Sequence, residues 1–161
     1  MRKGAPDKLV VVDEMGSRTD MTRTHGRAPA GERLTGEAVP RNRGCVTTVL
    51  GALTHQGIEA HMEVEGGTSL EVWDNLAAHK CRALIDVIES RGARVVFLPP
   101  YSPDFSPIEL AWSKVKARLR KWRFRTRSAL RQGIHLALAA ISPSDAAGWF
   151  AHCGYSVAQA I

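Results

Sequence analysis

Residues 97–116, FLPPYSPDFSPIELAWSKVK, hold the strongest structural signals of the chain. They begin inside the apolar run RVVFLPP (94–100), which predicts a buried strand ended by a proline pair. After a loop, apolar side chains recur on one helix face from Pro107 to about Lys121, at Ile108, Trp112, Val115 and Leu119. The stretch therefore predicts a strand, a loop and a helix, with Glu109 in the first helical turn.

The segments on the N-terminal side predict further strands. KLVVVDE (8–14) is an apolar run closed by acids, which is typical of a buried strand. CVTTVLGAL (45–53) and GIEAHMEVE (57–65) flank a short polar turn and predict a β-hairpin. Residues 15–44 are rich in Gly, Arg and Thr, and we expect a loop there with room for one short strand. Residues 70–73 predict another strand.

Helical periodicity dominates the rest of the chain. Apolar residues recur at helical spacing from Ala77 until Gly92 supplies a C-terminal stop. Two more helices are predicted over about Arg127–Ile141 and after Pro143. The order strand, hairpin, strand, helix, strand, helices predicts a single α/β domain over residues 1–161, with one central sheet.

The charge of the chain favours a polyanionic partner. Its 161 residues include 22 Lys plus Arg against 16 Asp plus Glu, a net charge of +6. Nucleic acid is the usual partner of such a protein, and an ordinary basic protein is the alternative. The sequence has no apolar run of about 18 residues and no signal peptide, so we expect a cytoplasmic protein without membrane contact. The three scattered cysteines predict reduced thiols rather than disulfides.

Three acids lie where predicted strands end or helices begin: Asp13, Asp74 and Glu109. Carboxylates gathered from separate strands repel one another and need a cation if all are to stay ionised. Oxygen ligands of this kind suit Mg²⁺ or Mn²⁺. Two such ions can activate a nucleophile and stabilise the leaving oxygen of a phosphodiester.

Each acid also has a structural alternative. Asp13 could cap the following turn, and Glu14 could be the ligand in its place. Asp74 with Asn75 could begin a helix as its N-cap. Glu109 with Ser106 fits a capping box, with proline at the first helical position.

At this point four blocks of sequence resemble DDE-type transposases of the mariner-like insertion-sequence group. Residues 97–116 resemble the signature block of that family, and WDNLAAHK (73–80) resembles its second-acid motif. VVVDEMGSRTDM (10–21) resembles the first-acid block, and HGRAPAGERL (25–34) resembles the Gly-Arg-rich segment after it. The spacing of 34 residues between Asp74 and Glu109 also agrees with the family. GYSVAQ near the end is similar to the closing segment of the family.

The resemblance implies a ribonuclease-H-like fold, a mixed sheet flanked by helices, that cuts and joins DNA with divalent metal. It implies that Asp13, Asp74 and Glu109 are the catalytic, metal-binding triad. Asn75 and His79 would support the triad or contact DNA, and an ordinary helix histidine is the alternative for His79.

A basic cluster follows Glu109 on the predicted helix and its exit. Its members are Lys114, Lys116, Arg118, Arg120, Lys121 and Arg123. We expect these side chains to contact DNA phosphates, so that salt weakens the binding. A solvated helix face is the alternative.

The chain departs from the family in two ways. Met1 lies only 12 residues before Asp13, so we expect the N-terminal helix-turn-helix region to be absent or supplied by a separate transposase chain. The family also places a crossover helix before the strand of the second acid. Residues 65–69 are too few for that helix, because a parallel crossover needs about a dozen residues or more. A β-hairpin over 61–74 is the alternative, and it would put Asp74 at the wrong edge of the sheet.

The sequence therefore predicts a DDE transposase or endonuclease domain for metal-dependent DNA cleavage and strand transfer. Because the crossover helix is missing, we expect little or no activity from this chain. We still expect Asp13 and Glu109 to lie near each other. The alternatives are a non-catalytic remnant that binds DNA or forms homo-oligomers, and a nuclease that hydrolyses DNA without joining it.

Overall fold

A computed structural model describes residues 8–33, 44–66, 82–99 and 102–155. Within these residues one antiparallel sheet has the strand order β1-β2-β3, with β1 Val11–Arg18, β2 Val46–Thr54 and β3 Gly57–Glu65. The helices are α2 Arg82–Ser90, the 3-10 turn η3 Pro103–Phe105, α3 Pro107–Trp122, α4 Arg127–Ala139 and α5 Pro143–His152. None of these helices is long and apolar enough to cross a membrane.

The register of the sheet brings residues from all three strands into rows. Asp13 lies opposite Gly51, and Gly51 lies opposite His61. The next row on the same face contains Met15, Val49 and Glu63. Side chains of directly opposed residues point to the same face of a sheet, so each row defines a line across it.

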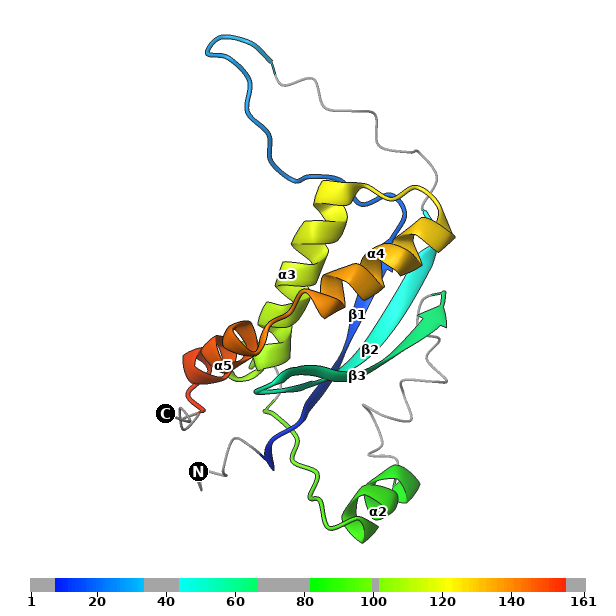
Figure 1. The fold of residues 1–161 in the computed structure, drawn as a ribbon, viewed down its shortest axis with the longest axis vertical. Helices are drawn as coiled ribbons and strands as arrows, with labels where there is room; N and C mark the ends of the chain where they lie inside the picture. Colours follow the sequence, from blue (N-terminus) through cyan, green and yellow to red (C-terminus); the bar gives the residue numbers. More distant parts are fainter. Residues whose placement is uncertain (1–7, 34–43, 67–81, 100–101, 156–161) are drawn as a thin grey trace.

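Helices α3, α4 and α5 cover that face in one layer, while α2 stands apart from the layer (Figure 1). Helix α3 lies against β1 and β2, and α5 contacts β3. The buried core between sheet and helices includes Met15, Val49, Leu53, Ile108, Trp112, Val115, Leu119, Leu130, Ile134 and Phe150. The core therefore fixes α3, the helix that carries Glu109, against the strand that carries Asp13.

Gly51 allows the closest approach between α3 and the sheet. A Cβ atom at this position would lie 2.5 Å from Cη2 of Trp112, whose side chain is buried. Glycine in a strand interior often marks such a close approach. The indole of Trp112 therefore packs directly on the backbone of β2.

Most of the predicted helices and the hairpin are confirmed. The hairpin turns between Thr54 and Gly57, as the sequence indicated. Helices α3 to α5 lie within a few residues of their predicted limits, and α2 agrees with the described part of the helix predicted before Gly92, whose start at Ala77 lies outside the described residues. Thr126 caps α4, and Ser142 with Asp145 forms a capping box at α5. Local signals were sufficient here because each element carries its own apolar period and its own start signal.

The prediction of a buried strand at 94–100 is wrong for the residues that are described. Residues 93–99 form neither helix nor strand, and Val96, Phe97 and Leu98 are exposed. A strand needs a neighbour to pair its backbone N–H and C=O groups. In the described part of the chain the sheet ends at β1, so this apolar run has no ladder to join.

The predicted strand at 8–14 is shifted, and the prediction that it is a buried strand is only partly correct. Strand β1 extends to Arg18, through residues that we expected to form a loop. Its side chains alternate in burial, and Val10 and Val12 are more than half exposed. The helices pack on one face only, so these valines have no cover from the described helices.

The segment around the second acid lies outside the described residues. This applies to the predicted strand at 70–73, to Asp74 and Asn75, and to His79. Their predicted roles, and the single domain over 1–161, stay predictions.

Candidate metal and DNA site

Asp13 lies on the face of β1 that α3 covers. Its side chain alternates with those of exposed Val12 and Glu14, and it is half-buried. The indole N–H of Trp112 is buried and makes no hydrogen bond of normal geometry within the described residues, but it lies close enough to Asp13 to stabilise the carboxylate. Of the two neighbouring acids, Asp13 rather than Glu14 is therefore the one on the α3 side.

The environment of Asp13 disfavours its ionised form. Burial raises the pKa of Asp13 to about 6, and the charge of Glu14 adds to the rise. The backbone amide of Glu14 and the indole of Trp112 lower the pKa and offset part of this rise. A carboxylate with such a pKa is a candidate for a functional group that works beside a cation.

Glu109 lies one turn before Trp112 on α3. Its side chain is exposed, and α3 begins at Pro107 with Ser106 as N-cap. The Ser106 side chain makes no capping hydrogen bond, so the predicted capping box does not form. Residues three apart on a helix share a side, so Glu109 and Trp112 are neighbours on α3. Asp13 and Glu109 thus both adjoin Trp112, although their closeness to each other stays a prediction.

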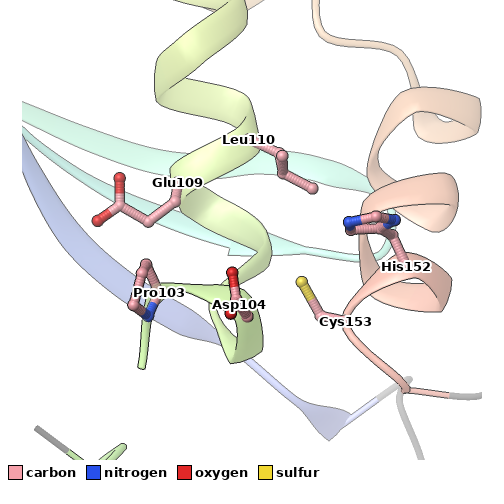
Figure 2. Close-up of a pocket in the computed structure, with 6 residues that line it drawn as sticks. All are labelled: Pro103, Asp104, Glu109, Leu110, His152 and Cys153. Carbon is pink, nitrogen blue, oxygen red and sulfur yellow. The ribbon is translucent and has the colours of Figure 1, made fainter. Parts of the chain in front are cut away.

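A small pocket opens beside the start of α3. It has a volume of about 150 Å³ and is lined by Pro103, Asp104, Glu109, Leu110, His152 and Cys153. Figure 2 shows the Glu109 carboxylate pointing away from His152 and Cys153, which come from the end of α5. Burial and the charge of Asp104 raise the pKa of the Cys153 thiol, which favours the inert protonated form. Glu109 is therefore oriented away from the thiol side of the pocket.

The pKa of Asp13 leads to a prediction about stability. Between about pH 4 and pH 6 the folded chain binds more protons than the unfolded chain, so its stability should fall as pH rises through this window. Because Asp13 is only partly buried, the loss should be on the order of 1–2 kcal/mol. Asp13→Asn should remove this pH dependence of the free energy of unfolding and be more stable than wild type at pH 7. Urea unfolding of both proteins at pH 4.5 and pH 7 measures the effect.

Glu14→Gln serves as the control for Asp13→Asn. It removes a neighbouring charge but leaves the buried carboxyl group, so most of the slope should remain. An unchanged slope in Asp13→Asn would contradict this description of the site.

The comparisons with known proteins concern both the segment around α3 and the fold of the chain. No curated protein matches the chain by sequence. Residues 68–131 match the family described as DDE superfamily endonuclease. This segment belongs to that superfamily. The DDE segment includes Asp74, Glu109 and all of α3, whereas Asp13 precedes it.

The fold is similar to that of a solved transposase. The chain matches the Mos1 transposase paired-end complex with left transposon end at a TM-score of 0.73 and 17% identity, covering 94% of this chain and 54% of that one. It matches the Mos1 mariner paired-end complex with Mn at a TM-score of 0.67 and 18% identity, and the match covers 95% of this chain and 53% of that one. It matches a pre-cleavage Mos1 transpososome at a TM-score of 0.63 and 17% identity, and the match covers 98% of this chain and 59% of that one. This chain thus spans little more than half the length of these proteins, and at such identities the likeness is one of fold.

The basic residues of the DDE segment divide between two flanks of α3. Lys114 pairs with Asp145 of α5 and lies over the ring of Trp149, and Arg118 donates to the carbonyl of Ala137 on α4. The pKa of Asp145 falls to about 2 because of Lys114 and Ser142. Lys114 and Arg118 therefore hold the helix layer together. This is a structural role in addition to the predicted contact with DNA.

Lys116 and Arg120 lie on the flank that carries Glu109. They follow Glu109 by seven and eleven residues, which is two and three helical turns. Within the described residues, Lys116, Arg120 and Lys121 make no hydrogen bond or ion pair. Glu109, Lys116 and Arg120 are thus aligned along one side of the helix.

One further cluster, formed by His61, Glu63 and His135, was not predicted from the sequence. Its members come from β3 and α4, and His61 and His135 are 74 residues apart in the chain. The alternation of His61 and Glu63 on one strand was the available signal, but only the packing of α4 brings the third residue to them.

Proposed function

We propose that this chain is the catalytic-type domain of a DDE transposase, which acts on DNA beside a divalent cation. The observation that carries the proposal is the position of Asp13 next to Trp112, one helical turn after Glu109. Strand β1 brings Asp13 beside Trp112, and helix α3 carries Glu109 one turn before that residue, so we expect the two acids to face one metal site. The family match of 68–131 and the Mos1-like fold support it.

The residues present fit a hard cation. Asp13 and Glu109 offer carboxylate oxygens, and Asp74 would complete the set by resemblance. A cation near Asp13 would offset the burial that raises its pKa. When bound, divalent ions in such sites activate a nucleophile and stabilise the leaving oxygen of a phosphodiester. The Mn and Mg in solved Mos1 complexes support the choice of Mg²⁺ or Mn²⁺.

The chain's own residues would orient DNA toward these acids. Lys116 and Arg120 extend from the Glu109 flank as fixed positive charges that a phosphate backbone can follow. The hydrophobic core holds α3 rigidly on the sheet, so the acids and cations keep their relative positions.

A non-catalytic DNA-binding remnant is the second candidate function. The observation in its favour is that the sheet ends at β1 in the described part of the chain, while the apolar run at 94–98 forms no strand there. A remnant would bind DNA and metal without efficient cleavage.

Two matched double variants test the DNA surface. Lys116→Ala with Arg120→Ala and Lys114→Ala with Arg118→Ala both remove two positive charges from α3. We expect the first pair to weaken binding to all DNA sequences alike and to reduce the salt slope by about one unit per lost phosphate contact. The second pair should change the DNA slope much less, because its side chains contact α4 and α5.

Fluorescence anisotropy with a labelled duplex, at several salt concentrations, measures both quantities. Wild-type affinity that does not change with salt would contradict the proposal. Equal losses in the two double variants would contradict the assignment of DNA contact to the Glu109 flank.

A further inference from the structure

The cluster of His61, Glu63 and His135 joins β3 to α4 and contains none of the acids that the sequence predicted as metal ligands. His61 and Glu63 alternate on β3 and therefore point to the same face, toward α4. His135 comes from α4, which packs over that strand. Each of the three side chains offers one ligand atom, and these atoms all lie within 4.8 Å of one another.

The distances suit a small ion. Nε2 of His61 lies 3.2 Å from Nδ1 of His135. A tetrahedral zinc ion with bonds of about 2.0–2.1 Å needs ligand atoms roughly 3.3 Å apart. These two nitrogen atoms are thus spaced to share a metal ion. Oε1 of Glu63 lies near the other nitrogen of His135, Nε2, so the His135 ring or the carboxylate must turn before all three residues bind one ion. The two imidazoles could also share a proton in a hydrogen bond. The environment of the Glu63 carboxylate decides between a bound metal ion and a shared proton.

Glu63 is the observation that favours an ion. Its side chain is only 8% exposed, and its Oε2 accepts from Arg131 at 2.8 Å. Its Oε1 is buried and accepts no hydrogen bond of normal geometry within the described residues, although it lies 3.2 Å from Nε2 of His135. A buried carboxylate oxygen without a proper donor is costly. A cation between this oxygen and the imidazoles would satisfy it.

We propose that His61, Glu63 and His135 bind Zn²⁺, with a solvent-facing fourth position for water. Two imidazole nitrogens and one carboxylate oxygen are a ligand set that zinc takes, whereas Mg²⁺ prefers oxygen alone. Arg131 fixes the carboxylate in the way that outer hydrogen bonds orient metal ligands. The exposed imidazole rings leave a path by which the ion can enter. The ion would tie β3 to α4.

Zinc titration of the full chain against a chromophoric chelator tests the site. We expect one Zn²⁺ per chain, and a loss of affinity of at least about 100-fold in His61→Ala and in His135→Ala. Co²⁺ in place of zinc should give the visible absorption of a tetrahedral site. An excess of Mg²⁺ should not displace the zinc.

Two control variants remove competing zinc ligands elsewhere. Cys45→Ser removes an exposed thiol and His25→Ala an exposed imidazole, and both should bind zinc as wild type does. Zinc should raise the melting temperature of wild type but not of His61→Ala. Because His61 and His135 are exposed, their variants should fold, which circular dichroism checks. The absence of zinc binding by wild type, or unchanged binding in both histidine variants, would overturn the proposal.

Discussion

A helix of about 15–20 residues inserted between Gly67 and Leu70 should give this chain metal-dependent DNA nicking, which we expect to be weak or absent in the unmodified chain. Only residues 66–69 separate β3 from the strand predicted at 70–73, just before Asp74, and a parallel crossover needs about a dozen residues or more. Catalytic groups must be held within about 0.5 Å of their working positions, so a misplaced Asp74 removes the chemistry. Conversion of supercoiled plasmid to nicked circles, with Mg²⁺ or Mn²⁺, measures the effect.

Two controls isolate the role of the crossover. The inserted chain with Asp74→Asn should lose its nicking, because the third acid is then missing. A Gly-Ser insert of equal length should restore less activity, because it has no apolar face to pack on the sheet. Robust metal-dependent cleavage by the unmodified chain, abolished by Asp74→Ala, would refute the explanation.

Trp112→Ala should cost about 3–5 kcal/mol in the free energy of unfolding. The side chain is 1% exposed and joins α3 to both β1 and β2. Its removal leaves a cavity at the centre of the core that the rigid sheet cannot fill. Since small domains have only about 5–15 kcal/mol of stability, much of the chain should be unfolded at modest urea concentrations.

Trp122→Ala is the matched control at the other end of the same helix. Trp122 is 40% exposed and contacts Phe124 ring to ring at 5.7 Å. Its loss should therefore cost clearly less than that of Trp112 in the same urea titration. Equal losses would show that Trp112 is not the central contact between helix and sheet.

The elements that could be predicted from the sequence are those with local signals. Each of these elements carries a local sequence signal: an apolar period, a turn sequence or a helix cap. They are the hairpin around Thr54 to Gly57 and the helices that begin at Pro107, Arg127 and Pro143. The likeness to DDE transposases also rested on contiguous blocks, and the family match of 68–131 confirms it.

What the sequence could not predict depends on contacts between distant segments. The apolar run at 94–98 has the composition of a buried strand, but composition does not supply the neighbour that a strand must pair with. The neighbourhood of Asp13 and Trp112 depends on how α3 crosses the sheet. The meeting of His61 with His135 depends in the same way on α4. Pairwise geometry of this kind is decided by packing, which one sequence alone does not encode in any local pattern.

The contact of Gly51 with Trp112 couples the residue types that these two positions can accept. A larger residue at 51 would collide with the indole, and a smaller residue at 112 would leave a hole above the glycine. Either change alone is harmful, whereas the two together can compensate, so their effects should not add. In an alignment of related chains, positions 51 and 112 should therefore vary together. Such covariation would record the crossing of helix and sheet without any structure.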